Sequence, residues 1–199
     1  MAYGSSTEFE TALLYARPLV SLLCKAMLMI VGMAAWMYTL RLAHAQPDVP
    51  REARIQAVLI LRMVKFVDWP PDSLAAGEAL TFCTWGDSDT EVALQALQGQ
   101  QVRDHSIVVR KLRPTLDTKG CHVIYVSDEV KDVNPTVLYG SGSRAVLTIS
   151  DMLDFNQRGG IIKLVRQSNR IGFDIQLRYA REHNLQIGAP LLELARVVN

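Results

Sequence analysis

A stretch of fifteen residues without a charged side chain, Ala26–Leu40, most constrains how this chain can fold. The basic residues Arg17 and Lys25 precede it, and the small residues Ala43 and Ala45 follow it at the spacing of a cleavage site. This order of basic, apolar and small residues is typical of a secretory signal peptide. We therefore expect residues 1–45 to be a signal peptide and residues 46–199 to be the folded, exported domain.

The same segment has two other interpretations. A run of fifteen residues is shorter than the roughly 20 that cross a bilayer, but the mostly apolar Pro18–Cys24 could extend it into an uncleaved anchor interrupted by Lys25. A buried helix of a cytoplasmic protein is the second alternative. Cleavage before residue 46 is the interpretation that uses the spacing of Ala43 and Ala45.

Residues 46–199 leave 154 positions, which suits one domain with a sizeable core. The whole chain has 21 Lys and Arg against 20 Asp and Glu, and the leader holds three of the basic and two of the acidic residues, so the domain is formally neutral. Dedicated nucleic-acid binding needs a clustered excess of basic residues and is excluded. An apolar content of 49% also excludes disorder as the main state.

Two of the three cysteines, Cys83 and Cys121, lie outside the leader. An even pair in an exported domain predicts one disulfide, and two buried thiols that never meet are the alternative. The chain contains no C-x-x-C pair, so redox chemistry of the thioredoxin kind has no support.

The pattern of apolar residues predicts an α/β domain. Pro50 suits the first position of a helix, and Asp174 can cap another one. Strands separated by helices and then a hairpin indicate a three-layer domain with a mixed β-sheet flanked by helices, and a C-terminal β-hairpin followed by two helices. The expected strands are 80–85, 107–112, 122–126 and 145–149, with a hairpin over 161–166 and 171–173; the expected helices are 50–67, 89–98, 175–183 and one that starts at 190.

Acidic residues follow two of these strands: Asp87 and Asp89 the first, Asp128 and Glu129 the third. The carboxyl ends of strands in an open α/β sheet commonly bind ligands and Mg²⁺. The S-x-x-E spacing of residues 88–91 favours the other interpretation, in which these side chains cap helices.

The remaining polar motifs do not compose a catalytic site, and we expect no enzyme activity, cofactor or metal. His105, His122 and His183 show no metal-ligand spacing and suit structural or exposed roles. The Gly-Ser segment 140–143 lacks the lysine of a phosphate-binding loop and suits a plain turn.

Basic residues gather in the last third of the chain, which suggests either a face that docks an acidic partner or an ordinary solvated surface. They are Arg158, Lys163, Arg166, Arg170, Arg178 and Arg181. Trp69, between Asp68 and Pro70, suits either a core position or an interface anchor.

The order of several short motifs resembles the YfiR family over about residues 50–198. The motifs are residues 65–70 (KFVDWP), Cys83 with Gly86-Asp87, residues 146–151 (VLTISD) followed by Phe155, residues 159–162 (GGII), residues 173–175 (FDI), Ala180 and residues 191–195 (LLELA). The family usually has Asn where this chain has Asp174, a substitution that would preserve helix capping.

This resemblance implies a periplasmic regulatory protein, typically dimeric, that binds and represses a membrane-bound diguanylate cyclase and so lowers cyclic di-GMP and biofilm formation. An outer-membrane lipoprotein that sequesters the repressor is the second implied partner. Relatives rely on disulfides, and Cys83 with Cys121 match one pair, although this domain lacks the cysteines of a second. As the partner-binding surface we expect the hairpin and the following helix, with Ile161, Lys163, Arg170, Phe173 and Arg178.

Two other functions compete with this one. The first is a periplasmic small-molecule sensor that uses the crevice at the strand ends near Asp87 and Asp128. The second is a hydrolase or phosphoacceptor domain that uses the same acids, which export away from ATP disfavours.

Overall fold

The structure is a computed structural model that describes residues 25–33, 49–112, 117–131, 133, 138, 145–167 and 170–199. The chain divides into two compact units, Met1–Asp48 and Val49–Asn199. Residues 25–33 of the first unit are helical. The rest of the expected leader, with its cleavage site, lies outside the described residues. No helix within the described ranges combines the length and apolar character that a membrane span requires.

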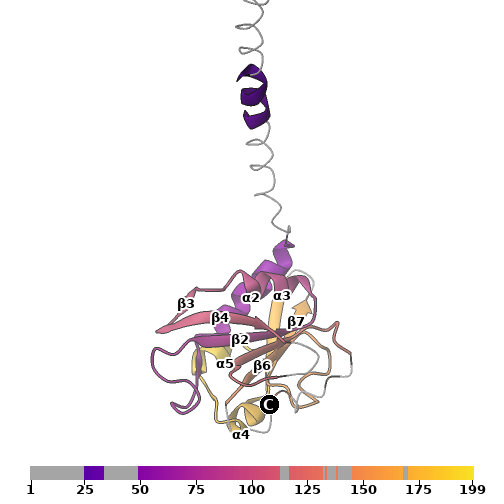
Figure 1. Ribbon diagram of the computed structural model, residues 1–199. Helices are drawn as coiled ribbons and strands as arrows, with labels where there is room; N and C mark the ends of the chain where they lie inside the picture. Colours follow the sequence, from indigo (N-terminus) through magenta and orange to yellow (C-terminus); the bar gives the residue numbers. More distant parts are fainter. Residues whose placement is uncertain are drawn as a thin grey trace, which may run out of the picture. The chain divides into compact units, whose positions relative to one another are not determined.

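The second unit is an α/β domain, drawn in Figure 1. Its elements in chain order are α2 (Arg51–Val64), β1 (Val67–Asp68), β2 (Leu80–Trp85), α3 (Asp89–Gln95), β3 (Gln101–Val102), β4 (His105–Lys111), β5 (Val123–Val126), β6 (Leu147–Ser150), β7 (Ile162–Gln167), β8 (Arg170–Ile175), α4 (Leu177–Glu182), β9 (Gln186–Ile187), α5 (Ala189–Leu194) and β10 (Val197–Val198). The expected class and the hairpin followed by two helices are confirmed, and four very short strands were not expected.

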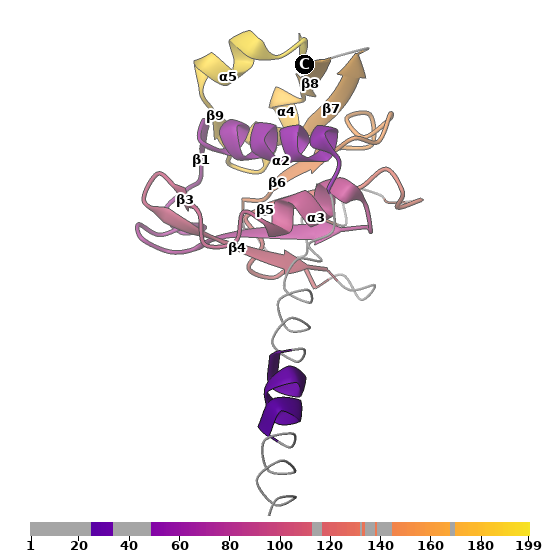
Figure 2. The same ribbon diagram turned by 90° about the horizontal axis from the view of Figure 1, so that it is seen from above.

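Eight strands form a mixed sheet in the order β10-β8-β7-β6-β5-β2-β4-β3. The five strands from β4 to β7 are mutually parallel, whereas β8 runs antiparallel to β7, and β3 antiparallel to β4. A second sheet pairs β1 with β9. All residues of β5 and β6 are buried, so both faces of the sheet centre are covered, as a three-layer arrangement requires. Helices α2 and α3 lie side by side over one face (Figure 2).

The sheet order reverses at β2, which pairs with β4 on one side and with β5 on the other. Gly86 directly follows β2 and has φ of 126°, a backbone conformation that favours glycine. A Cβ atom there would lie 2.6 Å from Cβ of Ser127, which follows β5. Glycine therefore lets the two strand ends approach closely at this reversal point.

Asp174 does not cap a helix, which corrects the expectation from the sequence. It lies in β8, and α4 begins three residues later, after Gln176, without a side-chain cap. The Asp174 carboxylate is nearly buried and pairs with Lys163 Nζ at 3.1 Å and with Arg196 Nε at 3.6 Å. Charge pairing across the hairpin, rather than capping, explains an acid at this position.

The last helix is also shorter than expected. Helix α5 ends at Leu194, whose side chain is 70% exposed, and residues 197–198 form β10 instead of continuing the helix. The Arg196 N–H donates to the Phe173 carbonyl at 2.9 Å, and the Asn199 N–H donates to the Ile175 carbonyl at 3.0 Å. Pairing with β8 satisfies these backbone groups and competes with the helix.

Candidate functional site

The acids expected at the strand ends mostly serve the fold. Asp87, whose side chain is 86% exposed, accepts a hydrogen bond from Lys111 Nζ at 2.6 Å. Ser88 Oγ accepts from the Glu91 N–H at 3.3 Å, so the expected N-terminal cap of α3 is present. Hydrogen bonds to Asp87 and then to Glu91 raise the pKa of the Lys111 ammonium.

Glu91 does not complete the reciprocal capping box. Its buried carboxylate instead accepts from Lys111 Nζ at 3.0 Å and from Thr84 Oγ1 at 3.3 Å. The charge of a buried carboxylate needs such partners, because desolvation penalises it. The sequence did not predict this pairing, because the position of Glu91 near the start of a helix suggested a capping role.

A shallow groove of about 620 Å³ lies beyond the carboxyl ends of β5 and β6. Asp128 lines it, as expected, but its acidic neighbour is Asp151 and not Asp87. Asp151 accepts from the Tyr125 hydroxyl at 3.2 Å and from the Asp128 N–H at 3.0 Å. Burial, and secondarily the charge of Asp128, raises the pKa of the Asp151 carboxyl. In the sequence, the position of Asp151 directly after the fourth strand was the signal that could have identified it as a residue of the groove.

The rest of this groove is mixed in character. Arg158 pairs with Asp154 at 2.6 Å, and Leu153 is 92% exposed. Within the described ranges, no three His, Cys, Asp or Glu side chains group closely enough to hold a metal ion. The groove thus offers hydrogen-bonding groups and one exposed apolar side chain to a ligand or partner.

The five residues expected to bind a partner do not share one surface. Ile161 is fully buried and Phe173 is 5% exposed, so both belong to the core and are unavailable to a partner. Lys163 is held by Asp174. Arg170 is exposed at the start of β8. Arg178 is exposed and lies over the Tyr179 ring, 4.8 Å from its centroid.

The basic residues of the last third are largely neutralised. Four of the six make ion pairs: Arg158 with Asp154, Lys163 with Asp174, Arg166 with Glu52 and Arg178 with Glu182. The pairing favours an ordinary solvated surface over a continuous basic face.

The Cys83–Cys121 disulfide is present in the structure, in agreement with the expectation. It joins β2 to Cys121, which lies two residues before β5, and both cysteines are buried. The Arg110 guanidinium lies beside it, with Nη2 3.1 Å from Cys121 Sγ and 2.7 Å from the Lys119 carbonyl oxygen. No sequence pattern had associated Arg110 with the disulfide.

His122 has the structural role expected of it. Its buried ring accepts from the Thr81 N–H at Nδ1 (3.0 Å), and Nε2 donates to the Ser73 carbonyl at 3.0 Å. Ser73 Oγ in turn accepts from the Ala145 N–H at 3.1 Å. These bonds join the amino-terminal ends of neighbouring strands.

Comparison with protein families decides the affiliation. The model of the YfiR/HmsC-like family matches residues 53–196, which is most of the chain and nearly all of the α/β domain. The chain belongs to the YfiR/HmsC-like family.

A solved structure of a conserved domain protein from Vibrio cholerae is similar at 11% identity and a TM-score of 0.44, over 74% of this chain and 60% of that one. This chain therefore spans less than two thirds of that protein. Comparison with curated proteins finds no match.

Proposed function

We propose that this YfiR/HmsC-like protein is a periplasmic repressor of a membrane-bound diguanylate cyclase. Residues 1–45 would be a signal peptide, and residues 46–199 would bind the periplasmic region of the cyclase, lowering cyclic di-GMP and biofilm formation. The family match over residues 53–196 is the observation that carries this proposal. An outer-membrane lipoprotein would compete for the repressor, which would act as a homodimer.

Repression of this kind requires differential binding. The protein must bind the inactive cyclase more tightly than the active one, and about 5 kcal/mol of difference moves a two-state balance from mostly on to mostly off. A domain that presents one fixed surface suits this task. The buried sheet centre and the disulfide give the domain that rigidity.

The contact surface that we propose follows the outer edge of β10. Three exposed apolar residues lie there, Leu194, Val197 and Val198. Arg170 opens β8, the strand beside β10, and the Arg178 N–H donates to the Asn199 carbonyl at 3.3 Å, next to the end of β10. Apolar residues between arginines are the composition that protein interfaces favour. This β10 edge surface keeps two of the expected partner residues and replaces the buried two.

A matched pair of leucine variants tests this surface. Leu194→Asp and Leu153→Asp place the same charge at two exposed leucines on different parts of the domain. Calorimetric titration with the periplasmic region of the cyclase should show at least a roughly tenfold loss of affinity for Leu194→Asp and none for Leu153→Asp. Equal affinities of both variants and wild type would contradict the β10 edge surface, and a loss confined to Leu153→Asp would assign the contact to the groove.

The groove at the carboxyl ends of β5 and β6 supports a second candidate function, a periplasmic small-molecule sensor. Asp128 and Asp151 lie together in it, and Arg158 borders them. Thermal-shift screening of the purified domain would detect a ligand that binds only the folded state. A stabilising compound whose effect disappears in Asp151→Asn would support this function, and no shift at saturating concentrations would remove its support.

A further inference from the structure

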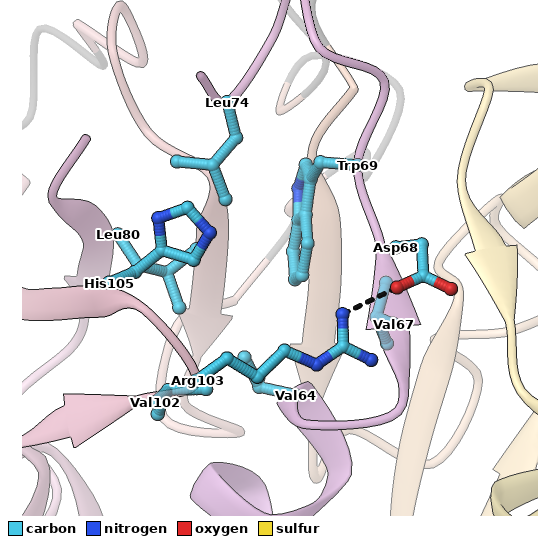
Figure 3. Close-up of a pocket in the computed structure, with 9 residues that line it drawn as sticks. All are labelled: Val64, Val67, Asp68, Trp69, Leu74, Leu80, Val102, Arg103 and His105. Atoms are coloured by element: carbon cyan, nitrogen blue, oxygen red, sulfur yellow. Dashed lines mark hydrogen bonds and ion pairs between the residues drawn. The ribbon is translucent and has the colours of Figure 1, made fainter. Parts of the chain in front are cut away.

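A cavity of about 90 Å³ lies at the opposite end of the sheet from this groove, beside the start of β2 and β4 (Figure 3). Its walls are about equally polar and apolar, and the apolar part includes Val64, Leu74 and Leu80. The polar groups that face it come from two segments far apart in the sequence, residues 68–69 after α2 and residues 103–105 between β3 and β4. It is separate from the β10 edge surface and from the groove, so it is unaccounted for by either candidate function.

One hydrogen-bond donor in this cavity lacks an acceptor. The Trp69 Nε1 atom is buried and makes no hydrogen bond to any of the described residues. Figure 3 shows the indole ring as one wall of the cavity, with its nitrogen turned toward His105 and Leu74. A buried N–H without a partner is costly, so a group that accepts from it is favoured at this position.

His105 faces the indole across the cavity (Figure 3). Its Nδ1 lies 2.7 Å from the Glu78 carbonyl oxygen, which can only accept, so Nδ1 carries the proton. In the neutral form of the ring, Nε2 then carries a lone pair, and this nitrogen is turned toward Trp69. The cavity therefore holds a donor and an acceptor on facing walls.

The charged residues at the rim compensate each other. Arg103 Nη1 lies 2.5 Å from Asp68 Oδ1, and both side chains are about half exposed. The rim thus gives the cavity an opening to solvent without a net charge. A neutral ligand suits such a site better than an anion or a cation, which would leave one member of the pair opposed by a like charge.

We propose that this cavity binds a small neutral alcohol. The ligand hydroxyl would accept from Trp69 Nε1–H and donate to His105 Nε2, and its hydrocarbon body would pack against the valine and leucine walls. The enclosed space of about 90 Å³ is smaller than the roughly 150 Å³ that holds benzene, so the ligand must be small, and the opening at the Asp68–Arg103 rim lets part of a branched alcohol such as isobutanol extend out of the cavity. The ligand class follows from the paired donor and acceptor, and the volume limits its size.

Titration of the exported protein with isobutanol tests the proposal. The indole N–H signals of Trp69 and Trp85 report the result in one ¹⁵N–¹H NMR spectrum, and Trp69→Phe assigns them. Trp85 does not line the cavity and serves as the internal control. A ligand of this size binds no tighter than about micromolar, so the titration extends to about tens of millimolar. We expect a saturable shift of the Trp69 signal and none of the Trp85 signal.

Isobutyrate, which has the same carbon skeleton and a negative charge, is the matched probe. We expect it to bind at least roughly tenfold more weakly than isobutanol, and His105→Phe to weaken isobutanol binding by about tenfold. If His105→Phe folds poorly, the wild-type titration still decides, and if Trp69→Phe folds poorly, Trp85→Phe assigns the two signals instead. Absence of a saturable Trp69 shift, or tighter binding of isobutyrate than of isobutanol, would overturn the proposal.

Discussion

The two ends of the central sheet differ in how their polar groups are satisfied. At the carboxyl end, acids are numerous, but Asp87, Glu91 and Asp151 all have hydrogen-bond donors from the protein itself. At the amino end, Asp68 and Arg103 likewise pair with each other, yet Trp69 keeps a buried donor without an acceptor. The comparison teaches that the number of charged residues at a strand end is a poor guide to ligand binding, and that the unsatisfied group is the better one.

The two ends of the sheet also differ in the interactions that stabilise them. The disulfide joins the middle of β2 to the amino end of β5, and the buried His122 ring links Thr81 to Ser73 at the amino end. The carboxyl end is held by the ion pair between buried Glu91 and half-exposed Lys111, and by Gly86, which allows the close approach of Ser127. We therefore expect substitutions at the amino end to cost more stability than those at the carboxyl end.

The largest effect should come from the disulfide. Cys83→Ser with Cys121→Ser should lower the free energy of unfolding by about 4 kcal/mol, since the bond closes a long loop in the unfolded chain. Calorimetry should show a fall in Tm of about 10 °C. Reduced wild-type protein is the control and should match the double variant. A fall of less than about 1 kcal/mol would show that the amino end does not depend on this bond.

His122→Ala should cause the next largest loss in the free energy of unfolding. It leaves the Thr81 N–H and the Ser73 carbonyl without their side-chain partner in the interior and should cost about 3 kcal/mol in urea unfolding. If water satisfied both groups, the cost would fall below about 1 kcal/mol, and the proposed stabilisation of the amino end by His122 would be wrong.

Lys111→Met probes the carboxyl end. The substitution leaves the buried Glu91 carboxylate with the Thr84 hydroxyl and without its cation, which should cost about 2 kcal/mol. Asp87→Asn is the matched control, because it touches the same lysine from an exposed position and should change stability by less than about 0.5 kcal/mol. Equal effects of the two variants would contradict the assignment of Glu91 as the buried partner.

The smallest effect concerns pH. Burial raises the pKa of Asp151 in the folded state above its unfolded value, so the folded protein binds this proton more tightly and the carboxyl opposes folding when it is ionised. Asp151→Asn removes that penalty. The variant should gain most over wild type near about pH 7, and the gain should shrink as the pH falls through the raised pKa toward the ordinary aspartate value. Urea unfolding of both proteins over this range measures it, and a gain that is independent of pH would contradict the account.

The sequence predicted the long elements better than the short ones. The apolar and β-branched run at residues 80–85 gave β2 at its observed bounds, and Ser88 gave the start of α3. The two-residue strands β1, β3, β9 and β10 depend on pairing with distant segments, which a local pattern does not contain. Asp174 shows the same limit: capping is a local rule, whereas its observed partners, Lys163 and Arg196, are brought together by the sheet.

The site residues were harder to predict for a related reason. Ile161 and Phe173 suit an exposed hairpin by sequence, but both side chains pack into the hydrophobic core and are buried. Arg110, Asp151 and the cavity residues Trp69 and His105 acquire their roles only through contacts across the fold. Asp151, directly after a strand, and Trp69, in the KFVDWP motif, stood in recognisable patterns, whereas Arg110 and His105 did not.

The most direct test of the central claim is the intracellular concentration of cyclic di-GMP in a strain that lacks the gene. The account predicts that the concentration rises on deletion, that the full chain restores it, and that a chain without residues 1–45 does not, because the repressor acts from the periplasm. An unchanged concentration under several growth conditions, or restoration by the chain without its leader, would contradict it.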